Sequence, residues 1–135
     1  MLKYKKYQKG SLQNKFNSNL LNIYQYNSKA LCLKTQTFGK CTISQIKAFK
    51  QIITKKTKKI KSQFFINIPA NFPITKKPLE VRMGKGKGNV NTYVAKLKKG
   101  CLICKIKYKN FNQFLFIKKI IKNASLRIAI KTKIG

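Results

Sequence analysis

Residues 77–90 read Lys77-Pro-Leu-Glu-Val-Arg-Met-Gly-Lys-Gly-Lys-Gly-Asn-Val90, and this segment organises the rest of the chain. Glycines alternate with lysines over positions 84–88. Glycine accepts positive φ and lets the backbone approach a partner closely, and backbone N–H groups beside ammonium groups suit phosphate. The spacing fits neither G-x-x-x-x-G-K-[ST] nor G-x-G-x-x-G. We therefore predict a loop that binds a polyanion, with a flexible linker as the alternative.

The charge of the chain predicts a nucleic-acid partner. Of its 135 residues, 32 are Lys or Arg and one, Glu80, is acidic, which gives a formal net charge of +31. A free globule with this charge repels itself, and the basic residues are spread along the whole chain, so we expect nucleic acid on several sides. A membrane-surface protein is the alternative. However, the chain has no Trp anchor, and no apolar run approaches the roughly 20 residues of a spanning helix.

The residue types that enzymes use for acid–base and nucleophilic chemistry are largely missing. The chain has no His, no Asp and a single Glu, so neither a carboxylate pair nor a catalytic triad can be built. Cys101 and Cys104 form C-x-x-C, and with Cys32 and Cys41 a four-thiolate zinc site is conceivable. Side chains three apart on a strand point to opposite faces. We therefore predict no catalysis, metal, cofactor or structural disulfide, and thiols that are small buried or half-exposed side chains.

Residues 1–29 are predicted to form a basic amino-terminal arm and loop. In residues 1–10, lysines are interleaved with Tyr4 and Tyr7, which are available to stack on RNA bases. The following segment is polar and rich in Asn, with one irregular strand expected at about residues 20–26. The arm contributes four candidate RNA-binding lysines, namely Lys3, Lys5, Lys6 and Lys9.

Residues 30–135 are predicted to form one α+β domain. Apolar alternation predicts strands at 30–38, 62–69, 90–97, 101–107 and 127–134. Apolar residues on both faces suggest that 62–69 is a central strand, and Lys98-Lys99-Gly100 predicts a hairpin between 90–97 and 101–107. The capping box Thr42-Ile-Ser-Gln45 predicts a helix over 43–59 whose lysine-rich face contacts RNA, and a second helix covers 110–122. Two helices on a mostly antiparallel or mixed sheet make a two-layer sandwich, with 73–90 as an extended loop.

Several segments of the chain resemble the L-sixteen family, the large-subunit ribosomal protein sixteen. The resemblance is carried by Pro73-Ile-Thr-Lys-Lys-Pro-Leu-Glu-Val-Arg-Met-Gly-Lys-Gly-Lys-Gly-Asn-Val90. The segments Lys5-Lys6-Tyr-Gln-Lys-Gly10, Thr42-Ile-Ser-Gln-Ile46, Tyr93-Val-Ala95 and Lys99-Gly100 are also similar. The chain departs from the family at 11–28, which match poorly, and at 110–122, which lack the acids that the family often carries there.

The resemblance implies a structural protein of the large ribosomal subunit with a hammerhead-type fold. It implies binding to large-subunit rRNA near the peptidyl transferase centre, with aminoacyl-site tRNA and neighbouring large-subunit proteins as further partners. Besides the arm lysines, the implied rRNA- or tRNA-binding residues are Lys76, Lys77, Arg82, Met83, Gly84, Lys85, Gly86, Lys87, Gly88 and Asn89. The alternative is a basic nucleic-acid or membrane-surface protein that acts outside the ribosome.

The amino-acid usage indicates an organellar ribosome. Lys, Asn, Ile, Phe and Tyr, which have A/T-rich codons, are abundant, and all basic residues except Arg82 and Arg127 are lysines. Residues 1–10 do not read as a transit peptide, which would be rich in Arg and Ser. We therefore expect a protein that is encoded in an organelle and acts in the mitochondrion rather than the plastid. The two arginines mark positions that need a planar, forked cation.

Overall fold

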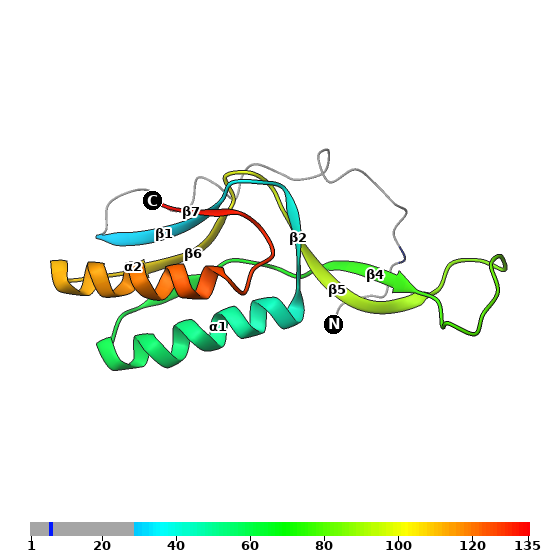
Figure 1. The fold of residues 1–135 in the computed structure, drawn as a ribbon, viewed down its shortest axis with the longest axis horizontal. Coiled ribbons are helices and arrows are strands. Elements are labelled where there is room, and N and C mark those ends of the chain that lie inside the picture. The colour runs from blue at the N-terminus through cyan, green and yellow to red at the C-terminus, as the bar shows by residue number, and fades with distance from the viewer. Residues whose placement is uncertain (1–5, 7–28) are drawn as a thin grey trace.

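The computed structural model describes residue 6 and residues 29–135, and it has two helices and two antiparallel sheets (Figure 1). One sheet has four strands in the order β3-β6-β1-β7, and the other has three in the order β2-β5-β4. The elements are β1 (Ala30–Thr35), β2 (Gly39–Thr42), α1 (Ile43–Thr57), the 3-10 turn η2 (Lys58–Ile60), β3 (Phe64–Ile66), β4 (Phe72–Lys76), β5 (Asn89–Leu97), β6 (Leu102–Lys107), α2 (Phe111–Ser125) and β7 (Thr132–Ile134). The predicted α+β class is confirmed, but the prediction of one sheet is wrong.

The two sheets share one bent ribbon of paired chain. Strand β1 pairs with β6, and its continuation β2 pairs with β5, so the same two segments run antiparallel through both sheets. At the bend, Thr35 Oγ1 accepts a hydrogen bond from the Cys101 amide at 2.9 Å, and the Thr35 carbonyl accepts one from the Gly100 amide at 2.8 Å. The predicted hairpin between 90–97 and 101–107 is therefore wrong, because β5 and β6 belong to different sheets. The predicted strand 30–38 is shortened by the same bend, because β1 ends at Thr35 and β2 begins at Gly39.

Both predicted helices are confirmed. The capping box at the start of α1 is present, with the Gln45 amide donating to Thr42 Oγ1 at 3.4 Å and the Thr42 amide donating to Gln45 Oε1 at 2.9 Å. The regular helix ends at Thr57, two residues before the predicted end, and continues as the turn η2. Helix α2 runs three residues beyond its predicted end. The 3.6-residue apolar period thus locates both helices, and the capping box fixes the start of α1.

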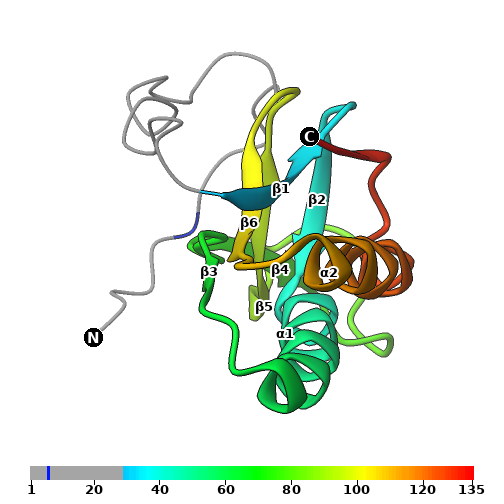
Figure 2. The same cartoon turned by 90° about the vertical axis from the view of Figure 1, so that its left-hand side faces the viewer.

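The core lies between the helices and the four-stranded sheet. Figures 1 and 2 show α1 and α2 side by side on one face of that sheet. The apolar stripe of each helix packs inward, because burying these side chains removes apolar surface from water. Completely buried side chains include Phe49, Ile53, Ile117 and Ile121 from the helices and Leu33, Ile103 and Ile106 from the sheet.

Two predicted strands differ from the observed ones. Among the strands of residues 29–135, β3 pairs with β6 alone and lies at the edge of the sheet, so the central position predicted for 62–69 is wrong. The apolar residue on the outer face of β3 is Phe65, whose side chain is 46% exposed. The Lys107 ammonium lies 5.8 Å from the centre of the Phe65 ring. Of the predicted strand 127–134, only Thr132–Ile134 is a strand. Ile128 and Ile130 are nevertheless buried, so the alternation reports burial and not strand pairing.

Strand β4 was not predicted, and it shortens the predicted loop 73–90. Phe72–Lys76 pairs with β5 from Phe72↔Val94 to Lys76↔Asn89, which leaves residues 77–88 as the loop. Pro73 is compatible with this strand because β4 is an edge strand. The expected strand at 20–26 lies outside the described residues, and the division of the chain at residue 30 stays a prediction. No helix in the described part of the chain is long and apolar enough to cross a bilayer.

Candidate nucleic-acid interface

The loop 77–88 stands at the far end of a two-stranded ribbon formed by β4 and β5. Figure 1 shows this ribbon extending away from the helices, with the loop at its tip. Pairing ends at Lys76↔Asn89, so the ten candidate residues of segment 76–89 all lie on the last rung or in the loop. Arg82, Met83, Lys85 and Lys87 are exposed. The ribbon thus presents the predicted site residues together, away from the core.

The three glycines of the loop are needed for two different reasons. Gly84 and Gly86 have φ of +100° and +87°, a region that favours glycine, and Lys85 between them has φ of +50°. At Gly88 the reason is space, because a Cβ would lie 2.7 Å from the Lys76 carbonyl oxygen and 2.9 Å from the Lys77 amide nitrogen. The alternation of Gly and Lys therefore permits a backbone path that few other sequences can adopt.

Two lysine side chains bind carbonyl groups of the loop. Lys77 Nζ donates a hydrogen bond to the Gly84 carbonyl oxygen, which links the base of the loop to its glycine-rich segment. Lys6 Nζ donates to the Lys87 carbonyl oxygen at 3.2 Å, so one predicted arm residue does lie at the loop. The other arm candidates, Lys3, Lys5 and Lys9, lie outside the described residues. These contacts concentrate ammonium groups around the glycines and give the loop a cationic surface.

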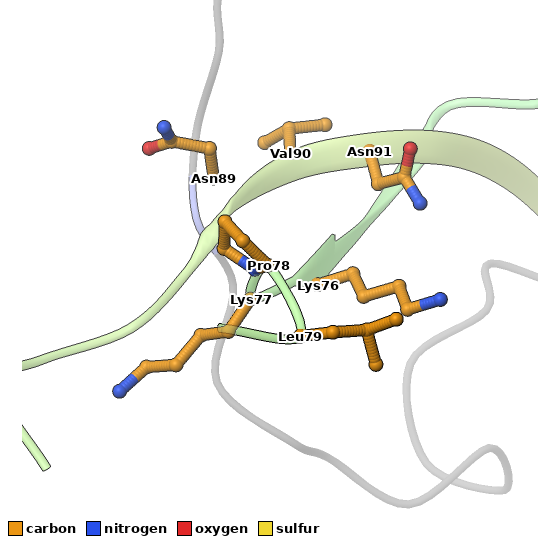
Figure 3. Close-up of a pocket in the computed structure, with 7 residues that line it drawn as sticks. All are labelled: Lys76, Lys77, Pro78, Leu79, Asn89, Val90 and Asn91. Atoms are coloured by element: carbon orange, nitrogen blue, oxygen red, sulfur yellow. The ribbon is translucent and has the colours of Figure 1, made fainter. Parts of the chain in front are cut away.

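An open hollow of about 350 Å³ lies where the loop joins the ribbon (Figure 3). Its lining combines ammonium, amide and apolar groups from Lys76, Lys77, Pro78, Leu79, Asn89, Val90 and Asn91. Asn91 was not predicted as a site residue, and it lies on β5 where the register with β4 shifts between Ile74 and Thr75. Leu79 is 95% exposed and Met83 is fully exposed, so apolar side chains accompany the cations here.

A second cationic surface lies on α1. Lys47, Lys50, Gln51, Thr54, Lys55 and Lys58 line a shallow hollow of about 660 Å³ along the exposed face of this helix. Their spacing of three and four residues places them on one side of the helix, opposite the buried Phe49 and Ile53. This arrangement matches the lysine-rich face expected from the sequence.

Within the described residues, the four cysteines do not come together with one another or with Glu80 into a group that could hold a metal ion. All four thiols are free; Cys41 and Cys104 are buried and Cys32 and Cys101 are half-buried, which agrees with the burial predicted for them. Burial raises the pKa of Cys41 and Cys101, and it raises the pKa of Cys104 to about 12, to which the neighbouring Cys32 also contributes. Since the thiolate is the metal ligand, these protonated thiols act as small apolar side chains. No group of three or more His, Cys, Asp or Glu residues with suitable geometry occurs in the part of the chain described.

The sequence is similar to known proteins along most of its length. Residues 2–135 match the family described as ribosomal protein L16p/L10e. The large ribosomal subunit protein uL16c of Euglena longa is 36% identical over 132 residues, covering 98% of this chain and 92% of that protein. Protein uL16 of Buchnera aphidicola subsp. Cinara cedri is 34% identical over 130 residues (96% and 89%). Protein uL16 of Xylella fastidiosa strain M12 is 37% identical over 105 residues (77% and 72%).

The family match spans residues 2–135, and two of these relatives align over 96% or more of the chain. The chain therefore belongs to the ribosomal protein L16p/L10e family, and it is a structural protein of the large ribosomal subunit and not an enzyme.

Proposed function

We propose that this protein binds large-subunit rRNA through the loop 77–88 and that the loop lies near the peptidyl transferase centre and the aminoacyl-site tRNA. The observation that carries the proposal is the position of the loop at the tip of a protruding ribbon, where Arg82, Lys85 and Lys87 are exposed. Backbone at positive φ and flexible cations suit contact with phosphates at close range. The proposed contacts are Lys3, Lys5, Lys6, Lys9, Lys76, Lys77, Arg82, Met83, Gly84, Lys85, Gly86, Lys87, Gly88 and Asn89.

The remaining partners follow from the charge. A net charge of +31 with one carboxylate calls for phosphate on several faces, so rRNA is proposed to cover the α1 lysines as well as the loop. Neighbouring large-subunit proteins would then contact the surfaces that RNA leaves open. The helices on one face of a sheet and the contact of Lys6 with Lys87 support the finer assignment to a hammerhead-type fold with an amino-terminal arm.

Hydroxyl-radical footprinting of large subunits tests the loop proposal. In subunits carrying the wild-type chain, we expect protected rRNA nucleotides near the peptidyl transferase centre. Gly86→Val should expose those nucleotides while Lys58→Ala leaves them protected. Identical footprints for both variants would refute the proposed role of the loop. A large pool of wild-type chain away from large subunits in a sucrose gradient would favour the extra-ribosomal alternative.

The ribosome is proposed to be organellar. The near-replacement of arginine by lysine supports this, and so does the similarity over 98% of the chain to uL16c of Euglena longa. Between the two organelles, we propose the mitochondrion, and we propose that the gene lies in the organelle genome. The plastid is the second candidate, because the similarity to uL16c of Euglena longa favours it. Quantification of the protein in purified mitochondria and plastids decides between them, and a nuclear gene would refute organellar coding.

A further inference from the structure

An array of three aromatic rings ends in open solvent at the start of α2. The Tyr108 and Phe114 rings meet edge to face, with centroids 5.3 Å apart and planes at 67°. Phe114 in turn stacks on Phe111, with centroids 5.9 Å apart and planes at 16°. Tyr108 and Phe114 pack against the core, whereas Phe111 is 71% exposed. The array is therefore anchored in the fold and presents one flat ring on which a further planar group can stack.

Lysines lie before α2 and along the same face of the helix as this open ring. Lys118 and Lys122 follow Phe111 by seven and eleven residues, which places all three on one face of α2, and Lys109 precedes the helix. These lysines are exposed, and the helix contains no Asp or Glu. Leu115, 52% exposed, lies on the same face one turn after Phe111. The outer surface of α2 thus combines an aromatic platform with cations about 10 to 16 Å away along the helix.

The partner that satisfies both features is single-stranded RNA. An apolar protein groove closing over this face would bury the lysines, and burying an unpaired charge is costly. An unpaired nucleobase can instead stack on Phe111 while neighbouring phosphates bind the ammonium groups. We propose that α2 holds an unpaired base of RNA on Phe111, with the adjacent phosphates on Lys109, Lys118 and Lys122. This inference rests on the proposed function, in which RNA surrounds the protein.

The α2 contact is separate from the loop contact. Figure 1 shows the start of α2 and the loop 77–88 at opposite ends of the long axis. A base held on Phe111 would give the protein a second, stacking-based attachment, which tolerates any base because every base has a flat face. The loop and the α2 surface can therefore be tested independently.

The test compares oligouridine with an abasic ribose-phosphate chain of equal length, both titrated onto the full chain at moderate salt. The wild type should bind oligouridine more tightly. Phe111→Ala should weaken oligouridine binding by about 5- to 150-fold and leave binding of the abasic chain unchanged. Phe111→Trp should restore the preference, and Leu115→Ala, a matched exposed apolar control on the next turn, should have little effect. Circular dichroism checks that each variant is folded.

A second measurement locates the contact. Oligo-5-bromouridine, irradiated with the wild-type chain, should crosslink to the tryptic peptide 110–118, and Phe111→Ala should abolish this product. The inference is overturned if that peptide is not crosslinked, or if the Phe111→Ala variant still binds oligouridine more tightly than the abasic chain. It is also overturned if the only effect of Phe111→Ala is the release of a neighbouring protein from the large subunit. In each of these cases the wild-type chain would still sediment with large subunits. Failure of this inference can therefore be distinguished from failure of the proposed function.

Discussion

Gly86 and Gly100 provide a matched pair of positions that separates the role of the loop from that of the fold. Both glycines have positive φ, +87° and +79°, and an added Cβ would meet nothing within 4 Å at either site. A residue with a side chain in the left-handed region costs about 1 to 2 kcal/mol, so the intrinsic strain is similar at the two positions. Their surroundings differ, because Gly100 is held at the bend between the sheets, where its amide donates to the Thr35 carbonyl at 2.8 Å.

We expect Gly100→Ala to lower the free energy of unfolding by about 1 to 2 kcal/mol, since the bend cannot relax without breaking the hydrogen bonds that join Thr35 to Gly100 and Cys101. Such a loss corresponds to a fall in Tm of roughly 2 to 8 °C per kcal/mol for chains of this size class. Gly86→Val should change the free energy of unfolding by less than about 0.5 kcal/mol, because the loop is exposed and can adjust. The same adjustment redirects Lys85 and Lys87 and should slow peptide-bond formation.

The assays are urea unfolding of the free chain and the rate of peptide-bond formation in large subunits carrying each variant. The expected pattern is a stability defect for Gly100→Ala with normal catalysis by the ribosome, and the reverse for Gly86→Val. If Gly86→Val destabilises the chain as much as Gly100→Ala does while translation stays normal, the loop is a structural linker and the reasoning fails.

Arg82→Lys should leave the chain folded but slow translation or late subunit assembly, because lysine lacks the planar fork of arginine. Lys58→Ala should have little effect, since the neighbouring α1 lysines supply similar charges. Equal effects of the two variants in translation assays and subunit profiles would contradict this. The affinity for rRNA should fall by several decades between low and high salt. The reason is that log K falls with log[salt] by about 0.9 per phosphate neutralised, and about ten phosphate contacts are expected. An affinity that does not change with salt in filter binding would be inconsistent with the charge argument. Burial raises the pKa of Cys104 from 9.0 to about 12, so the unfolded chain releases this proton first as the pH rises. The free energy of unfolding should therefore fall by about 1.4 kcal/mol per pH unit between these values relative to Cys104→Ala, and parallel pH curves for the two proteins would rule out a buried neutral thiol.

Local patterns in the sequence were sufficient wherever the physical cause is local. The capping box at Thr42, the 3.6-residue period of both helices and the glycine-rich loop all depend on neighbouring residues, and each was found in the structure. The candidate residues of segment 76–89 were also brought together as expected, since they are contiguous in the chain. Composition alone indicated a nucleic-acid partner, because net charge does not depend on folding.

Tertiary structure decided how the strands are distributed and which surfaces are open. The division into two sheets depends on the bend where Thr35 binds the chain near Gly100, a contact between residues 65 positions apart that no local period reveals. Ile128 and Ile130 alternate like a strand but are buried from the irregular segment between α2 and β7, because the core accepts apolar side chains from any backbone conformation. Likewise, the helical period of α2 hides the exposure of Phe111, since only packing shows which ring of the aromatic array remains uncovered.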